Sequence, residues 1–296
     1  MNLYIVESPL QLICAFESIN LNKKDHYLLL IRLSGRGDND KHLRNCIDFL
    51  GLKCVFFTLR PNHVKIDFIF NLSLWIKVFF RKYEIIYFGS ACSSFIKFIN
   101  LFLWGKEYIY LDDGLATLRI QKKIEQRKIN ELNFFTFFNI SGIGKQKIYK
   151  NEFNAIKNYL EKSRTHSSYF IGQPVEKMIG FSKEDYIKCV NMVAKQYSKE
   201  SPLIYIPHRV EDIENIKGIS NIKILKIEMP VELFFILSSN ELPSKIYSCY
   251  STALITLKNM IPNVECYSFY SKVNNLEEID VIYSYFKETS INIIEF

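Results

Sequence analysis

The sequence lacks the features that would place it in several common classes of protein. Its seven cysteines are scattered without a C-x-x-C pair, and its five histidines show no metal-ligand spacing. We therefore expect neither a disulfide framework nor a bound metal, and a reducing compartment fits best. No segment reaches the ~18 uncharged apolar residues of a membrane span. The first residues lack the basic start and the small-residue cleavage site of a signal peptide, which favours a cytoplasmic protein.

Motifs of nucleic-acid-binding proteins and internal repeats are also missing. The net charge of +7 and the aromatic content of 15% would suit a nucleic-acid partner. However, no recognition-helix, RNP-type or zinc-finger pattern accompanies them, so we expect no nucleic acid. An anionic small molecule, or the anionic face of a membrane, explains the charge as well. Hydrophobic residues at 48% indicate a folded globular chain, and 296 residues leave room for two domains.

Short apolar runs alternate with amphipathic stretches along most of the chain. In the first half the runs predict strands at Leu3–Val6, Tyr27–Leu33, Cys54–Leu59, Glu84–Phe88 and Tyr108–Leu111. The stretches between them predict helices at Pro9–Leu21, Lys41–Leu50, Asp67–Arg81 and Ser93–Leu103. Strands that alternate with helices predict βαβ units and a mostly parallel sheet.

The pattern loosens from residue 119 to residue 160, where we expect peripheral helices and a crossing between domains. It then resumes with predicted strands at Ser168–Ile171, Leu203–Ile206, Ile222–Ile227, Ile246–Tyr250 and Val264–Phe269. Helices are predicted at Lys183–Tyr197, Val231–Ser238, Ser251–Met260 and Glu277–Phe286. We therefore predict an α/β fold with two Rossmann-like domains, residues 1–165 and 166–296, facing each other across a cleft. The last helix is expected either to close the second domain or to pack back on the first.

Unusual polar clusters follow the predicted strands directly. They are Glu7-Ser8-Pro9-Leu10-Gln11, Asp112-Asp113-Gly114, Gly172-Gln173-Pro174-Val175-Glu176, Pro207-His208-Arg209, Glu228-Met229-Pro230-Val231-Glu232 and Tyr250-Ser251-Thr252. The second predicted strand ends in the loop Ser34-Gly35-Arg36-Gly37-Asp38. Turn chemistry alone explains prolines and glycines at these places. It explains less well a diacid, a His-Arg pair and a Ser-Thr helix start. Because open α/β sheets bind ligands at the carboxyl edge of their strands, these clusters predict one ligand-binding cleft.

The residue types in these clusters suit the transfer of a sugar from a nucleotide. Ser251 or Thr252 would cap the following helix, whose free N–H groups form a phosphate site, although simple capping explains the pair too. His208 and Arg209 offer donors to a phosphate, and the histidine offers a proton to a leaving phosphate. Glu232 suits either a helix dipole or a ribose diol. Asp113 would act as general base for a hydroxyl nucleophile.

The order of three motifs resembles that of bacterial sialyltransferases. These motifs are Asp112-Asp113-Gly114, a strand ending in Pro207-His208, and Tyr250-Ser251-Thr252-Ala253-Leu254. Each is short, but they share an order with the acidic-acidic-Gly, His-Pro and Ser-Ser/Thr motifs of that group. The chain is most similar to glycosyltransferase family 52, the lipooligosaccharide α-2,3-sialyltransferases, and next to the capsule polysialyltransferases.

The resemblance implies a GT-B fold, a CMP-sialic acid donor, inversion at the anomeric carbon and no metal or other cofactor. It implies a galactose-terminated acceptor on lipooligosaccharide, O-antigen or capsule, and hence a place in the cytoplasm, free or at the inner face of the inner membrane. The first domain would bind the acceptor, with Ser8, Gln11 and Arg36 on that side. The second would bind CMP through six residues: Gln173, His208, Arg209, Glu232, Ser251 and Thr252.

Two positions depart from the family pattern. Arg209 stands where the family has the proline of His-Pro. Val175 stands where family 52 has an aspartate assigned as the base, after a Gly-Ser-Pro turn that is Gly172-Gln173-Pro174 here. Either Glu176 or Asp113 would therefore take the proton, with Asp112 as a supporting acid. We favour Asp113, because a strand end holds it more rigidly.

Three alternatives stay open at this point. The donor sugar could be another nonulosonic acid, Kdo or a hexose, and the chain could be a non-catalytic module that binds a nucleotide or a glycan. The aromatic segment Asp67–Arg81 also allows two interpretations. Seven of its large apolar side chains, Phe68, Ile69, Leu72, Trp75, Ile76, Phe79 and Phe80, lie among lysines and an arginine. Helical spacing makes much of this segment core, and the alternative is a face that rests on the inner membrane near a lipid-linked acceptor.

Overall fold

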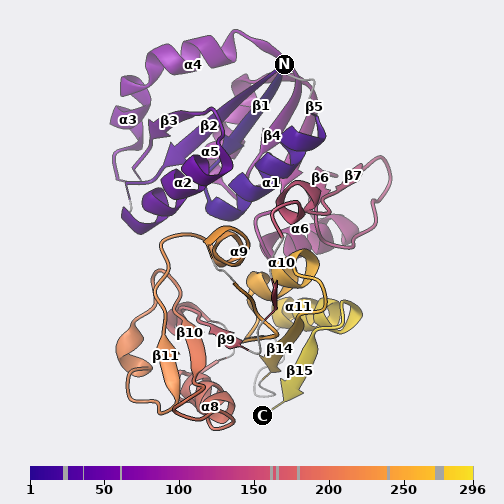
Figure 1. Cartoon of the computed structure of the whole chain (residues 1–296). Helices are drawn as coiled ribbons and strands as arrows, with labels where there is room; N and C mark the ends of the chain where they lie inside the picture. The colour runs from indigo at the N-terminus through magenta and orange to yellow at the C-terminus, as the bar shows by residue number, and fades with distance from the viewer. Residues whose placement is uncertain are drawn as a thin grey trace. The chain divides into compact units, whose positions relative to one another are not determined.

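The computed structural model describes residues 1–22, 26–35, 37–60, 62–160, 163–164, 167–178, 181–238, 241–270 and 277–295. The chain divides into two compact units (Figure 1). The first unit holds Met1–Ile156 and Glu228–Pro230, and the second holds Lys157–Ile227 and Val231–Phe296. Every strand pairing recorded in either unit is parallel. The predicted class, two parallel-sheet α/β units, is confirmed.

The first unit is built on one seven-stranded sheet in the order β3-β2-β1-β4-β5-β6-β7. Its strands are β1 (Asn2–Val6), β2 (Tyr27–Leu33), β3 (Val55–Thr58), β4 (Lys82–Phe88), β5 (Trp104–Leu111), β6 (Asn133–Thr136) and β7 (Ile148–Lys150). Its helices are α1 (Pro9–Leu21), α2 (Gly37–Leu50), α3 (Val64–Phe70), α4 (Leu72–Phe79), α5 (Ser94–Ile99), the 3₁₀ helix η1 (Asn100–Phe102), α6 (Ala116–Glu125) and, at the unit boundary, α7 (Asn154–Lys157). The strand order reverses between β1 and β4, which makes that point the switch point of the sheet.

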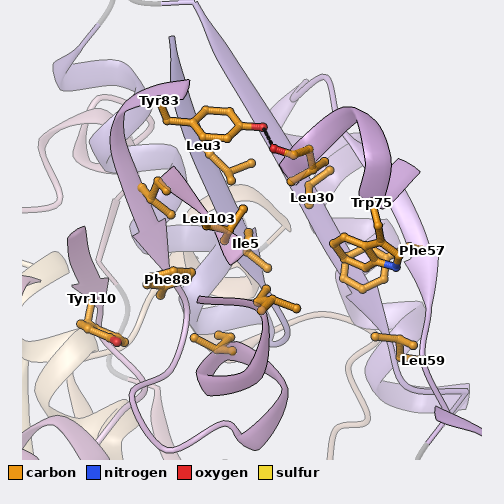
Figure 2. Close-up of a cluster of buried hydrophobic side chains, with 14 of the residues drawn as sticks. Leu3, Ile5, Leu30, Phe57, Leu59, Trp75, Tyr83, Phe88, Leu103 and Tyr110 are labelled. Carbon is orange, nitrogen blue, oxygen red and sulfur yellow. Dashed lines mark hydrogen bonds between the residues drawn. The ribbon is translucent and has the colours of Figure 1, made fainter. Parts of the chain in front are cut away.

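Side chains alternate between the two faces of this sheet. On one face, Leu3 and Ile5 of β1 join a buried cluster with Trp75 of α4 and with α5 and α6 (Figure 2). On the other face, the Tyr4 hydroxyl lies 3.0 Å from Ser18 Oγ of α1, and α2 packs beside α1. Helices on both faces bury all five residues of β1, four of which are apolar.

The second unit repeats this plan with a six-stranded sheet in the order β11-β10-β9-β13-β14-β15. Its strands are β8 (Ser163–Arg164), β9 (Ser168–Ile171), β10 (Leu203–Ile206), β11 (Ile222–Ile224), β12 (Glu241–Leu242), β13 (Lys245–Ser248), β14 (Glu265–Tyr270) and β15 (Asn292–Glu295), with β8 and β12 forming a separate pair. Its helices are η2 (Val175–Lys177), α8 (Lys183–Ala194), η3 (Ile213–Asn215), α9 (Val231–Leu233), the π-helix η4 (Phe234–Ser238), α10 (Thr252–Met260) and α11 (Glu277–Glu288). The switch point lies between β9 and β13.

Aromatic side chains form much of the second core. Phe170 of β9 stacks on Tyr205 and Phe269 and meets Tyr186 of α8 edge-on. Tyr169, which points to the opposite face, packs edge-on against Phe235. Helix α11 belongs to this unit, where it is followed by β15, a strand that the sequence pattern did not indicate.

The region from residue 119 to residue 160 differs from the expectation of peripheral helices. Beyond α6, it adds two strands to the first sheet, with Phe134 and Phe135 paired to Tyr110 and Leu111 of β5. The buried ring of Phe134 belongs to the core cluster, so the aromatic run is part of the sheet rather than a connection between domains.

The predicted helix at Asp67–Arg81 is also different in the structure. It is two helices, α3 and α4, separated at Asn71, whose side chain donates to the backbone oxygens of Asp67 (2.6 Å) and Thr58 (3.3 Å). Trp75 is buried, as expected of a core residue. The expectation that much of the segment is core holds for part of it, since Phe68 and Phe79 also pack against the core cluster. The other four side chains are exposed: Ile69 67%, Leu72 48%, Ile76 49% and Phe80 89%. No helix in the described part of the chain is long and apolar enough to cross a membrane.

Candidate functional site

The carboxyl edge of the first sheet collects polar residues around its switch point. Glu7 and Ser8 follow β1, Gly89 follows β4, and Asp112 and Asp113 follow β5. Since β1, β4 and β5 are neighbours in the sheet, these positions adjoin one another.

Gln11 connects two of these strand ends. Its Nε2 donates to Asp113 Oδ1 at 2.8 Å, and its Oε1 accepts from the backbone N–H of Glu7 at 2.8 Å. Ser8 begins α1 as its N-cap, with its side chain accepting from the N–H of Gln11, and so fixes the turn that carries Gln11. The Asp113 N–H donates to Thr117 Oγ1 at 3.3 Å. Among the described residues no side chain bonds to Asp113 Oδ2, which leaves that oxygen able to accept a proton.

Gly89 makes the connection sterically possible. A Cβ at this position would overlap Oε1 and Cδ of Gln11 and would lie 3.1 Å from the carbonyl oxygen of Ile5. The Gln11 side chain therefore crosses the end of β4 where only a glycine leaves room, between the end of β1 and that of β5. Sequence alone does not mark Gly89 as part of the site, because a glycine after a strand is also an ordinary turn residue.

Asp112 lies in a different environment from its neighbour Asp113. Its side chain is fully buried, and its two oxygens accept from Thr136 Oγ1 (2.8 Å) and the Phe137 N–H (2.7 Å). Burial raises the pKa of the Asp112 carboxyl to about 7, and these hydrogen bonds oppose the rise. Asp112 thus joins the end of β5 to the end of β6 and holds Asp113 in place, and it does not face solvent.

Glu7 and Arg32 form an ion pair at the same edge. The guanidinium also donates to the Leu59 carbonyl oxygen (3.3 Å) and lies 5.1 Å from the Phe95 ring centre. The two side chains are only 13% and 19% exposed, so the pair is shielded from water on most sides. Arg36, predicted on the acceptor side, lies outside the described residues.

The carboxyl edge of the second sheet brings together three of the predicted donor-binding residues. Gln173, His208 and Ser251 follow β9, β10 and β13, which are adjacent strands. The Ser248 hydroxyl donates to the Ile171 carbonyl at 2.7 Å and lies 3.3 Å from Gln173 Oε1. His208 Nδ1 accepts from the Val210 N–H at 3.4 Å, which places the proton of a neutral imidazole on Nε2.

Glu211 is a partly buried acid at this edge that the sequence pattern did not indicate. Its carboxylate accepts from the Tyr205 hydroxyl and from the His208 N–H, the latter at 2.9 Å. The Tyr205 hydroxyl also lies 2.8 Å from that of Tyr186. Burial raises the pKa of Glu211 to about 7. Glutamate side chains are usually exposed, and the residues before Glu211, Arg209 and Val210, are exposed too. No pattern in the sequence therefore indicated that Glu211 is shielded from solvent.

The other predicted residues of this edge occupy varied positions. Ser251 is the N-cap of α10 and accepts from the Ala253 N–H at 3.2 Å, so the expected capping is present, and Thr252 is the first residue of the helix. Glu232 is only 7% exposed, and its Oε1 accepts from Thr256 Oγ1 at 2.7 Å. Burial raises the pKa of Glu232. Glu176, on η2, and Arg209 are both exposed.

Within the ranges that the structure describes, no three or more His, Cys, Asp or Glu side chains are grouped so as to hold a metal ion.

Comparisons with known proteins identify the fold. No protein-family model matches the sequence, and no curated protein matches it. Among solved structures, the chain is similar to E. coli heptosyltransferase WaaC with ADP, at 8% identity and a TM-score of 0.51, over 100% of this chain and 93% of that one. It is also similar to Arabidopsis thaliana UGT89C1 complexed with UDP-L-rhamnose, at 9% identity and a TM-score of 0.56, over 99% and 85%. The two Rossmann-like units of this chain therefore have the GT-B fold of glycosyltransferases.

Proposed function

We propose that the protein is a glycosyltransferase that moves a sugar from a nucleotide to a hydroxyl group of a glycan. The observation that carries the proposal is the position of Asp113 at the carboxyl edge of the first sheet, next to its switch point. One of its oxygens is held by Gln11, and no described side chain bonds to the other. Two similar structures, of a heptosyltransferase with ADP and of a protein with UDP-L-rhamnose, support a nucleotide sugar as the donor.

The motif order supports CMP-sialic acid as that donor and a galactose-terminated bacterial surface glycan as the acceptor. The acceptor hydroxyl would attack the anomeric carbon and break its bond to the phosphate oxygen of CMP, with inversion. Asp113 Oδ2 would take the hydroxyl proton, while His208 Nε2–H would donate to the departing phosphate. The N-terminus of α10, with Ser251 and Thr252, would bind that phosphate.

The structure also bears on the choice between Asp113 and Glu176 as base. Asp113 is half-buried and oriented by a hydrogen bond from a buried glutamine, whereas Glu176 is exposed on a single 3₁₀ turn. A general base needs a fixed position relative to the proton that it removes. This difference favours Asp113.

Nucleotide binding and turnover test the proposal. We expect CMP to raise the melting temperature without added metal, and to raise it more than UDP or GDP does. CMP-sialic acid with a galactoside should release CMP, and Asp113→Ala should abolish the release. Tighter binding of UDP would point to another sugar, and CMP release that is equal in wild type and Asp113→Ala would refute Asp113 as base.

We further propose that the first unit rests on the inner face of the inner membrane. The proposed contact surface, here called the apolar face, comprises exposed side chains of α3, α4, α5, η1 and the residues beside them. They are Val64, Ile66, Ile69, Phe70, Leu72, Ile76, Phe80, Phe98, Leu101, Phe102 and Trp104, with Phe70 81% and Phe80 89% exposed. Ring contacts of Phe68 with Phe98 (6.1 Å) and of Phe79 with Phe102 (5.4 Å) join the two segments into one surface.

The charges around the apolar face suit an anionic membrane. Residues 62–82 carry one acid, Asp67, which is buried and paired with Arg60 at 2.7 Å, and residues 92–106 carry none. Exposed lysines on α3, α4 and α5 are interspersed with the apolar side chains: Lys65, Lys77 and Lys97. Exposed apolar area combined with basic residues is typical of interfacial binding.

Vesicle sedimentation tests this contact. Anionic vesicles at low salt should bind the wild type, and Phe70→Ser with Phe80→Ser should weaken binding about tenfold or more, because each ring leaves the interface. Leu21→Ser is the matched control, since Leu21 is an exposed apolar residue (59%) of α1 outside the apolar face. Equal binding by both variants, or none by the wild type, would exclude the membrane. Dimers that the double variant disrupts would instead assign the face to a second copy of the chain.

A further inference from the structure

A second feature of the first unit is an apolar pocket between α3 and α5, of about 620 Å³. Its lining is mostly apolar, from the end of β3, from α3 and from α5: Leu59, Val64, Phe68, Ile69, Phe95 and Phe98. Four polar side chains complete it: Arg32, Lys65, Ser93 and Ser94. A pocket of a few hundred cubic ångströms, with apolar walls and few polar groups, is typical of a ligand site.

The pocket opens on the apolar face. Three of its lining residues belong to that face and are well exposed: Val64 43%, Ile69 67% and Phe98 49%. An apolar chain that lies in a membrane beneath this face could therefore enter the pocket without crossing polar surface.

A chain of three contacts leads from the pocket to Asp113. Arg32 lines the pocket and pairs with Glu7. The Glu7 N–H donates to Gln11, which donates to Asp113. The pocket and the carboxylate thus share one edge of the sheet, so that one molecule can have its apolar part in the pocket and its sugar at Asp113.

We propose that this pocket binds the apolar chain of a lipid-linked acceptor, next to the sugar that receives the transferred residue. The inference rests on the proposed function and adds to it the chemical class of the acceptor, a glycan attached to an alkyl, acyl or prenyl chain. Ser93, Ser94 and Lys65 would contact the polar linkage between chain and sugar. Arg32 is already paired with Glu7, so it needs no anionic partner from the ligand.

A series of β-galactosides with methyl, butyl and octyl groups tests the inference. Each methylene that enters the pocket is expected to raise affinity about threefold to fourfold. We expect calorimetry to give the octyl compound a Kd at least about tenfold below that of the methyl compound, and KM to follow the same order, with kcat little changed.

Two double variants of similar composition locate the effect. Ile69→Ser with Phe98→Ser removes apolar lining and should abolish the octyl preference. Ile76→Ser with Phe80→Ser changes the same apolar face outside the pocket, and should retain the preference. Ser94→Phe is a third variant, which fills the pocket from an exposed helix position and should also abolish the preference without removing a packed ring.

The outcomes separate this inference from the proposed function. Equal affinity for methyl and octyl galactoside, or equal loss of the preference in both double variants, would overturn the pocket assignment. CMP release with the methyl compound would then still support the transferase. Conversely, pocket-dependent octyl binding without any CMP release would support the pocket and refute the proposed reaction.

Discussion

At the scale of single residues, the adjacent acids Asp112 and Asp113 have different environments because successive side chains at a strand end point in opposite directions. Asp112 points into the protein, where two donors from β6 and the residue after it bind its oxygens. Asp113 points to the edge, where only Gln11 bonds to its side chain among the described residues. One acid therefore stabilises the position of the other, and only Asp113 is placed to react.

Asp113→Asn tests the role of Asp113 as base. The amide keeps the size of the side chain and an oxygen for the bond from Gln11, but it cannot take the hydroxyl proton. We expect kcat to fall by roughly 10²–10⁴-fold while CMP affinity, measured by calorimetry, hardly changes. Glu176→Gln is the control and should leave kcat nearly unchanged. If Glu176→Gln loses turnover and Asp113→Asn retains it, the base lies on the turn after β9.

His208→Ala should behave differently from Asp113→Asn. The imidazole would contact the donor phosphate both in the bound substrate and in the transition state, so its loss should weaken CMP binding as well as turnover. The measurement is the Kd for CMP together with kcat. A variant that loses only kcat would restrict His208 to proton donation, and one that loses neither would remove it from the site.

The pKa of Asp112 predicts a pH dependence of stability. In the unfolded chain an aspartate has a pKa of about 3.9, and in the folded protein burial raises that of Asp112 to about 7. Between these values the folded state holds a proton that the unfolded state releases, so the free energy of unfolding falls as pH rises through this range. The fall is at most about 1.4 kcal/mol per pH unit.

Asp112→Asn removes this titration. The melting temperature of the wild type minus that of the variant should therefore decrease from pH 5 to pH 7 and level off above about pH 7. The variant also changes two buried hydrogen bonds, which shifts its melting temperature by a similar amount at every pH. The test is therefore how the difference between the two melting temperatures changes with pH. A difference that stays constant over this range would contradict the assignment.

At the scale of helices and strands, the sequence predicted the bounds of an element correctly where turn and capping residues flank an apolar segment that is buried in the structure. Ser8-Pro9 marks the start of α1, and the structure has this helix at Pro9–Leu21, as predicted. Strands β2, β9 and β10 also have their predicted bounds, because each is a short apolar run between turn residues. The residues after these strands then lie at the carboxyl edge by topology alone.

The remaining elements depend on tertiary contacts that local pattern does not contain. Polar and apolar residues do not alternate along β6, and the strand forms because Phe134 and Phe135 pair with β5. The segment 150–156 is held by Glu17, a buried acid of α1 that accepts from the Ala155 (2.9 Å) and Ile156 (2.8 Å) N–H groups. Glu211 likewise is partly buried, through contacts with Tyr205 and His208 that composition cannot show.

Gly89→Ala tests how the end of β4 supports the site. The added methyl group would overlap the Gln11 side chain, so Gln11 should lose its bonds to Asp113 and Glu7. We expect kcat to fall about tenfold or more, with CMP affinity unchanged, because the base loses its fixed orientation. Gly37→Ala is the control, since nothing lies within 4 Å of a Cβ there; it should keep kcat and leave stability equal or slightly higher. Equal kcat in both variants would show that Gln11 does not position Asp113.

At the scale of the whole molecule, the chain uses one sheet plan twice. The first sheet has the order β3-β2-β1-β4-β5 at one end, and the second has β11-β10-β9-β13-β14. If the strands of each sheet are numbered along the chain, both orders read 3-2-1-4-5. The sequence shows no repeat, because a parallel sheet constrains burial and connection handedness and not residue identity. Each unit therefore has its own switch point, and the two carry different residues: an acid with a glutamine in the first, and a histidine with a capped helix in the second.

This division predicts that the two substrates protect different units. CMP should slow hydrogen exchange of backbone amides in residues 167–178, 203–215 and 249–256, which surround the switch point of the second sheet. At 100 times its Kd, CMP should stabilise the unit by about 2.7 kcal/mol, since it binds only the folded state. Octyl galactoside should instead protect residues 5–12 and 58–70 of the first unit. Mass spectrometry of exchanged peptides measures both effects in the full chain, with His208→Ala as control for CMP. Protection by CMP around Asp113 rather than around His208 would reverse the assignment of donor and acceptor to the two units.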